Sequence, residues 1–232
     1  MTLTRCMGCD MMGLVTNLTS QQYADILGSF TLKFPRRYGA ERLRKGFPSL
    51  RKVFDQIHEE TKGKPPTPLL FANRVWEACE EIPDTLREDV EARARRAHPS
   101  FCREVHLHLM LNERFGESAE VKSSAELDME YKTDFLIVSP VEPVAIRLHT
   151  YTDTPRSHIW INRRKGKKSR FTLNDQIREQ AAGLPTNDNE RHEIDVRLTL
   201  NAESSNTLDN GFWLYTDDHV EEVVREFENL HN

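Results

Sequence analysis

Polar side chains with hydrogen-bonding capacity share one face of a strand near the middle of the sequence. Over residues 144–152, apolar and polar residues alternate with the period of two that a β-strand requires. The polar residues that therefore project together are Arg147, His149 and Tyr151. A guanidinium and an imidazole on one face can grip a phosphate, and an imidazole can also act as a base or orient a water molecule. This strand is the first candidate for a functional site.

A run of positive charge follows this strand. Residues 154–174 contain seven basic residues and no acidic residue. The basic residues are Arg156, Arg163, Arg164, Lys165, Lys167, Lys168 and Arg170, and Trp160 and Phe171 lie close to them in sequence. Clustered cations neutralise phosphates and release counterions, and aromatic rings offer stacking surfaces, so the segment indicates nucleic-acid binding. The alternative is a solvated hairpin tip.

The formal net charge of -5 conceals a polarised sequence. Residues 36–52 contain seven basic residues and one acid, whereas residues 175–232 contain fourteen acids and four arginines. The first of these regions could extend the basic surface, and the second would then lie elsewhere or keep out the backbone of the wrong partner.

Composition favours a soluble globular protein inside the cell. Hydrophobic residues make up 38% and charged residues 30% of the chain. No apolar run approaches the roughly 20 residues that a membrane-spanning helix needs, so no membrane partner is expected. The N-terminus lacks the pattern of a secretory signal, and we therefore expect a cytoplasmic protein.

Two short patterns have the residue types of a metal site. Cys6 and Cys9 form a CxxC pair, but the sequence lacks a second CxxC or HxxxH pair to complete a structural zinc site, so free thiols are favoured. A half-site completed by another cysteine or a distant histidine is the alternative. His106 and His108 are two residues apart on a predicted helix, where their rings point about 200° apart, so a structural role is favoured over chelation.

Apolar spacing predicts helices first and then an α/β order. The predicted helices cover residues 20–30, 40–60, 69–81, 84–97, 101–114, 172–182 and 217–230. The predicted strands cover residues 119–129, 131–138, 144–152, 192–200 and 211–215. His98, Pro99 and Ser100 are expected to separate two helices. We therefore expect a helical N-terminal region, residues 1–97, and an α/β core with a mixed sheet, residues 98–232.

The order of elements and three features of the sequence resemble the restriction-endonuclease-like superfamily of PD-(D/E)XK proteins. Glu104 matches the acid of the first helix, and Thr133 and Asp134 stand where that family has its Pro-Asp pair. The (D/E)-x-K step of the family falls on Arg147 and His149, so a cation replaces a metal-binding carboxylate and a histidine replaces the lysine. The resemblance covers roughly residues 98–230 through a short motif.

The resemblance implies a restriction-endonuclease-like mixed sheet flanked by helices and a hydrolase that cleaves DNA phosphodiesters, in a setting such as restriction or antiphage defence. It implies a divalent ion, Mg²⁺ or Mn²⁺, held by Glu104 and Asp134. Arg147 and His149 would complete the catalytic group, with His149 as base or water-positioning residue. Further ligands would come from Asp128, Glu142 or Asp153.

Two other interpretations stay open. In one, the fold has lost its metal, and the chain is a noncatalytic nucleic-acid-binding or regulatory subunit whose Arg147 and His149 grip a phosphate. In the other, the chain has an unrelated α/β fold. DNA is the favoured nucleic acid, and a homodimer or a partner subunit is compatible with the resemblance.

Overall fold

The computed structural model describes residues 17–32, 46–124, 127, 133–140, 144–152 and 192–230. Helices come first in the chain: α1 (Ser20–Gly28), α2 (Leu50–Glu60), α3 (Pro68–Glu77), the short 3-10 helix η2 (Asp84–Leu86) and α4 (Arg87–Phe115). The strands follow: β1 (Glu120–Lys122), β2 (Phe135–Val138), β3 (Val144–Thr152), β4 (His192–Leu200), β5 (Asn206–Thr207) and β6 (Trp213–Leu214). Helix α8 (Asp217–Asn229) comes last.

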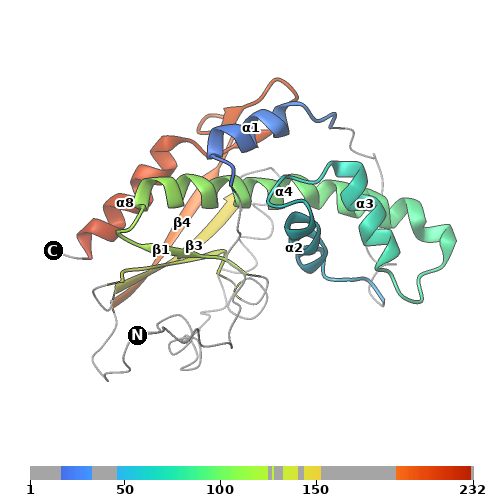
Figure 1. Ribbon diagram of the computed structural model, residues 1–232, viewed down its shortest axis with the longest axis horizontal. Coiled ribbons are helices and arrows are strands. Elements are labelled where there is room, and N and C mark those ends of the chain that lie inside the picture. Colours follow the sequence, from blue (N-terminus) through green and yellow to red (C-terminus); the bar gives the residue numbers. More distant parts are fainter. Residues whose placement is uncertain are drawn as a thin grey trace, which may run out of the picture.

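Helix α4 extends across the molecule and joins its two halves (Figure 1). It has 29 residues and continues through Pro99, so the predicted break at residues 98–100 is wrong. A proline inside a helix removes one backbone hydrogen bond and costs about 3 kcal/mol. Ala94 before the proline and Cys102 after it are buried in the same apolar cluster, and this tertiary packing stabilises the helix on both sides of Pro99.

Three of the preceding helices begin at hydroxyl caps. The side chains of Thr19, Ser49 and Thr67 accept hydrogen bonds from the backbone N–H groups of Gln22, Lys52 and Leu70. Each cap satisfies one of the free donors in a first helical turn. The cap at Ser49 also explains why α2 begins at Leu50, inside the predicted helix of residues 40–60.

The helical half has its own apolar cluster. Its largest fully buried side chains include Tyr23 of α1, Phe54 of α2 and Phe71 of α3, and the cluster also contains α4 residues between Val90 and Leu109. The hairpin of β5 and β6 joins this cluster through Phe212. Asn210 of the same hairpin donates to the carbonyl oxygens of Leu27 at 2.7 Å and Phe30 at 2.9 Å, which satisfies the end of α1. Residues far apart in sequence therefore complete the helical half.

The main sheet is mixed, as predicted, and has the strand order β1-β2-β3-β4. β2 pairs antiparallel with both β1 and β3, whereas β3 and β4 are parallel. The chain is therefore an α/β protein with a mixed four-stranded sheet. The predicted strand of residues 211–215 is shorter than expected and pairs with β5 in a separate two-stranded sheet.

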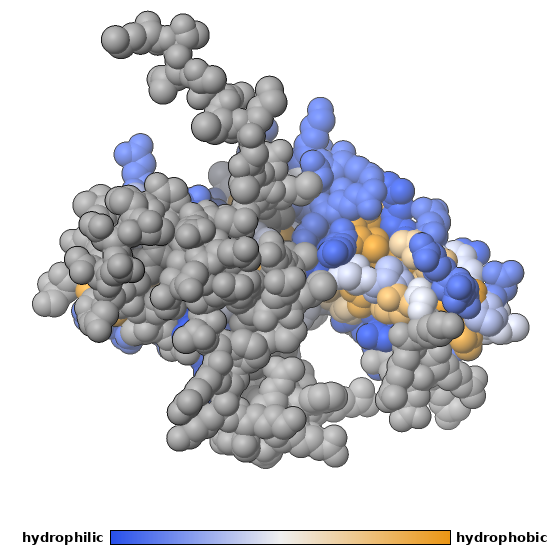
Figure 2. All heavy atoms as spheres, turned by 90° about the horizontal axis from the view of Figure 1, so that it is seen from below, coloured by the Kyte–Doolittle hydropathy of each residue, from blue (hydrophilic) through white to orange (hydrophobic). Residues whose placement is uncertain are grey.

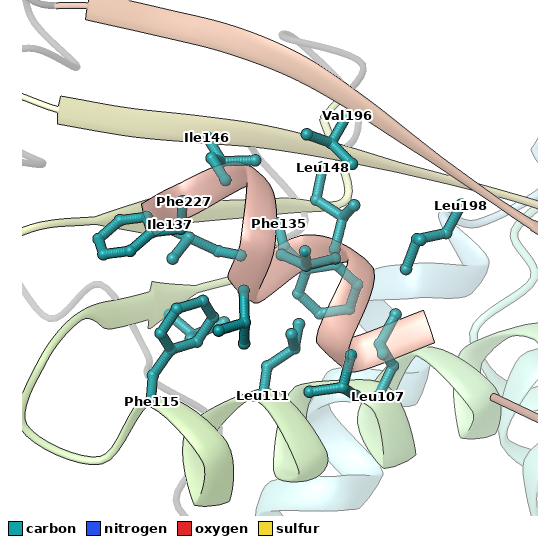
Figure 3. Close-up of a cluster of buried hydrophobic side chains, with 14 of the residues drawn as sticks. Leu107, Leu111, Phe115, Phe135, Ile137, Ile146, Leu148, Val196, Leu198 and Phe227 are labelled. Carbon is teal, nitrogen blue, oxygen red and sulfur yellow. The ribbon is translucent and has the colours of Figure 1, made fainter. Parts of the chain in front are cut away.

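One face of the sheet packs against α4 and α8, as Figure 3 shows. Leu107, Leu111 and Phe115 project from α4 toward Phe135 and Ile137 of β2, and Ile146 and Leu148 of β3 lie in the same cluster together with Phe227 of α8. Because side chains alternate along a strand, the neighbours of Ile146 and Leu148 face the other side of the sheet. This packing fixes which face of β3 carries its polar residues.

Several sequence predictions concern residues outside the described part of the chain. They include the basic residues of the segment 154–174, the helix of residues 172–182, and Cys6 with Cys9. The predicted division between residues 97 and 98 falls inside α4 and stays a prediction. Among the helices that the structure describes, none is both long and apolar enough to cross a membrane.

The described surface over the helical half is mainly hydrophilic, with a smaller group of apolar side chains (Figure 2). In the described part of the chain, two large apolar side chains are exposed, Leu69 and Leu70, and 56% of the surface of Leu69 is accessible. Both lie in the first turn of α3.

Replacing Leu111 with alanine should lower the free energy of unfolding by about 2–5 kcal/mol, because it leaves a cavity between α4 and the sheet. Chemical denaturation followed by circular dichroism measures this loss. The matched control is Leu69→Ala at an exposed position, which should change stability by less than about 0.5 kcal/mol. Similar losses for both variants would contradict the described core.

Buried histidines attach α4 to its neighbours. His98 Nε2 lies 2.7 Å from the carbonyl oxygen of Pro66, and His108 Nε2 lies 3.1 Å from that of Val121. His108 Nδ1 lies 3.3 Å from the hydroxyl of Ser123. Burial lowers the pKa of both histidines from 6.5 to about 4. The unfolded chain therefore takes up protons at a higher pH than the folded chain does.

Stability should fall as the pH decreases from about 6.5 to about 4, because neutral imidazoles favour the folded state. Each histidine contributes at most about 3 kcal/mol to this loss. Urea unfolding at pH 7 and pH 4.5 measures it, with His108→Gln as the comparison. Glutamine can still hydrogen-bond to Val121 but does not titrate, so the variant should lose less stability than the wild type. Equal losses would contradict a role for His108.

Candidate functional site

Glu104 lies near the middle of α4, where the two halves of the molecule meet. Its Oε2 accepts a hydrogen bond from Nη1 of Arg51 at 2.6 Å. Arg51 belongs to α2 and is only 5% exposed, and its Nε also donates to the carboxylate of Asp55 at 2.8 Å and 3.1 Å. The buried guanidinium thus joins two carboxylates and links α2 to α4.

Asp134 lies immediately before β2 and closes the end of the β2–β3 pair. Its backbone N–H donates to the carbonyl oxygen of Leu148 at 3.1 Å. Its Oδ2 accepts hydrogen bonds from the backbone N–H of Thr150 at 2.5 Å and from the Thr150 hydroxyl at 2.9 Å. The carboxylate of Asp134 thus accepts from the N–H of Thr150 in place of a backbone carbonyl, at the point where β2 and β3 separate. Asp134 therefore has a structural role in addition to any chemical one.

Tyr215, just before α8, is a buried phenol whose pKa responds to both of these acids. It is 3% exposed, and burial raises the pKa of its phenol. A hydrogen bond with Thr150 and the charge of Arg103 lower the pKa, whereas the carboxylates of Glu104 and Asp134 raise it. Both acids therefore lie close enough to act on one phenol. The electrostatics of Tyr215 thus involve both acids, and the convergence of Glu104 and Asp134 on one metal site stays a prediction.

Arg147 and His149 face away from α4. They alternate along β3 with Ile146 and Leu148, which pack in the cluster between the sheet and α4. Both are half-buried. The polar pair of β3 therefore lies on the opposite side of the sheet from α4, the helix that carries Glu104.

The donor set around Glu104 and Asp134 does not fit a divalent cation in this arrangement. Mg²⁺ and Mn²⁺ bind several oxygen ligands, and a neighbouring cation opposes their binding. Glu104 Oε2 is held by the guanidinium of Arg51. Arg103 is a second cation near Glu104: burial lowers the pKa of the Arg103 guanidinium, and the charge of Glu104 partly offsets that effect. Asp134 Oδ2 already accepts two hydrogen bonds.

Further metal ligands are not found nearby in the described residues. In that part of the chain, no group of three or more histidine, cysteine, aspartate or glutamate side chains is arranged to hold a metal ion. The additional acids considered from the sequence, Asp128, Glu142 and Asp153, lie outside it. His106 and His108, the other metal candidates, are both buried, and His108 hydrogen-bonds to Val121.

Sequence reasoning missed residues that define this region. Arg51 was counted in a basic cluster that could extend a nucleic-acid surface, but its burial between two carboxylates removes it from that role. The spacing of four residues between Arg51 and Asp55 on a helix was a signal for their ion pair. No local signal connects Arg51 with Glu104, or Thr150 with Tyr215, because each of these pairs meets only in the tertiary fold.

Replacing Asp134 with alanine should lower the free energy of unfolding by about 1–3 kcal/mol, because the backbone N–H of Thr150 loses its acceptor. Thr150→Val removes only the hydroxyl and keeps the backbone hydrogen bond, so it should cost about 1 kcal/mol. Chemical denaturation gives both values, and the amide of Thr150 should exchange with solvent faster in Asp134→Ala. A smaller loss for Asp134→Ala than for Thr150→Val would contradict this role.

Comparisons of the chain with protein-family models, with curated proteins and with solved structures give no match.

Proposed function

We propose that this chain is a nucleic-acid-binding or regulatory subunit with a degenerate nuclease-like site, and that it contacts phosphates rather than cleaving them. The observation that carries this proposal is the pairing of both candidate metal ligands within the protein. Glu104 is neutralised by the buried Arg51, and Asp134 closes the β2–β3 pair through Thr150. An acid that is held this way supports the fold and is a poor ligand for Mg²⁺.

The sequence supports the nucleic-acid part of the proposal. The segment of residues 154–174, with seven basic residues and no acid, begins two positions after the end of β3 at Thr152. Arg147 and His149 lie on the same strand, half-buried. A guanidinium is well suited to a phosphate because it stays charged and donates from a planar fork. DNA is the favoured partner, and RNA is the other arm of the test.

Binding to DNA should weaken as the salt concentration rises, because counterions are released when cations meet phosphates. Replacing Lys165, Lys167 and Lys168 with glutamine should lower the affinity and reduce the slope of log K against log salt by up to about three. Fluorescence anisotropy with labelled double-stranded DNA, single-stranded DNA and RNA measures both quantities.

The matched control is the double replacement of Lys62 and Lys64 with glutamine. Both are exposed lysines between α2 and α3, so the control removes surface charge at positions distant in sequence from the basic segment. It should leave the affinity nearly unchanged. The proposal is wrong if the wild type shows no salt-dependent binding to any of the three nucleic acids.

A metal-dependent nuclease, with a place in restriction or antiphage defence, is the second candidate function. What favours it is that the carboxylates of both Glu104 and Asp134 raise the pKa of Tyr215, since a nuclease of the resembled superfamily needs both acids in one region. Incubation with plasmid and single-stranded DNA in Mg²⁺ or Mn²⁺ separates the two candidates. Metal-dependent cleavage that disappears in Asp134→Asn and Glu104→Gln would establish the nuclease and overturn the noncatalytic proposal.

A further inference from the structure

A buried cation lies between two carboxylates at the junction of α2 and α4. The guanidinium of Arg51 reaches Asp55 through Nε, at 2.8 Å and 3.1 Å from its two oxygens, and reaches Glu104 through Nη1, at 2.6 Å. The side chain of Arg51 is 6% exposed, while those of Asp55 and Glu104 are 26% and 18% exposed. The two carboxylates therefore bind one guanidinium through different nitrogens, and all three side chains are largely shielded from water.

Such a pair of carboxylates requires positive charge. Burying a carboxylate without a partner is costly, and two of them close together repel each other. Neighbouring histidines do not supply the charge at neutral pH. Burial, helped by the charge of Arg51, lowers the pKa of His58 and of His108 to about 4. Arginine remains protonated at every physiological pH and can bind two carboxylates through different nitrogens.

We propose that Arg51 is the resident cation of this site. Its guanidinium lies between Asp55 and Glu104 and neutralises them, as a divalent cation neutralises the carboxylates of a metal site. Through Arg51, helix α2 pairs with the carboxylate of Glu104 and attaches it to the helical half. The inference rests on the proposed noncatalytic function, and it identifies the residue that makes Glu104 unavailable to a metal ion.

Thermal unfolding of the full-length chain with Mn²⁺ as the probe tests this role. Arg51→Met should lower the Tm by about 10 °C in EDTA, because it removes the guanidinium that hydrogen-bonds to both shielded carboxylates. Millimolar Mn²⁺ should restore at least half of that loss, since an ion that binds only the folded state raises the Tm. The wild type should show the same Tm in EDTA and in Mn²⁺.

The double variant Arg51→Met/Glu104→Gln separates a metal effect at this site from a general one. Without the Glu104 carboxylate, Mn²⁺ should no longer raise the Tm. A Tm of Arg51→Met that does not respond to Mn²⁺ would show that Arg51 acts by packing alone and would overturn the proposal. An equal response in the wild type would overturn it too, because the metal would then bind independently of Arg51.

Arg51→Lys keeps the experiment decisive if Arg51→Met does not fold. Lysine retains one charge but cannot span both carboxylates in the same way, so its Tm should lie below that of the wild type and should not respond to Mn²⁺. A wild-type Tm for Arg51→Lys, or a rise in its Tm with Mn²⁺, overturns the proposal.

Arg87→Met serves as the matched control, because Arg87 forms an ion pair with Glu91 in which its side chain is 53% exposed. Its Tm should change by less than about 3 °C, and a drop as large as that of Arg51→Met would overturn the special role of Arg51. These measurements contain no nucleic acid. A failure of nucleic-acid binding and a failure of the resident-cation proposal are therefore read from different experiments.

Discussion

The structure depends on one helix that belongs to two apolar clusters at once. Residues of α4 from Val90 to Leu109 belong to the cluster of the helical half, and those from Leu107 to Phe115 cover the sheet, so that the helix must present its apolar residues in two different directions where the two sets overlap. Cys102, Val105 and Leu109 lie in the first cluster, whereas Leu107 and Leu111 lie in the second. Around these positions α4 is therefore covered on two sides, and few of its residues face water.

This constraint explains why charged residues near the middle of α4 need partners within the protein. Glu104 lies between Cys102 and Val105, where neighbouring elements limit access to solvent. A carboxylate in that place must be neutralised or must shift its pKa. Arg51 supplies the neutralising charge, and Asp134 is held in a comparable way by the N–H and hydroxyl of Thr150. The two acids that resemble a catalytic pair are thus also part of the structural framework.

Periodicity predicted much of the sheet but less of the helical half. The strand of residues 144–152 and that of residues 192–200 have the predicted bounds, because their apolar residues face one buried cluster and alternate regularly. The predicted break at Pro99 failed because burial on both sides outweighs the local cost of a proline. Local patterns contain no information about such tertiary packing.

The site was predictable to a similar degree. Element order suggests Glu104 and Asp134 as a pair, which stays a prediction, whereas the partners that give them structural roles could not be inferred from it. Arg51 comes from 53 residues before Glu104, and Tyr215 follows the last strand. Those contacts depend on how α2 and α8 pack on the remainder of the fold, which no spacing within the sequence reveals.

The parallel pairing of β3 and β4 has a consequence for how the chain folds. The nine residue pairs of this ladder join strands that are separated in sequence by residues 153–191, so two distant parts of the chain must meet before any of them forms. Antiparallel pairing of β1, β2 and β3 is more local and can precede it. During synthesis, β3 would therefore expose an open edge until β4 leaves the ribosome. That interval is the stage at which the nascent chain is most exposed to pairing with a neighbouring chain.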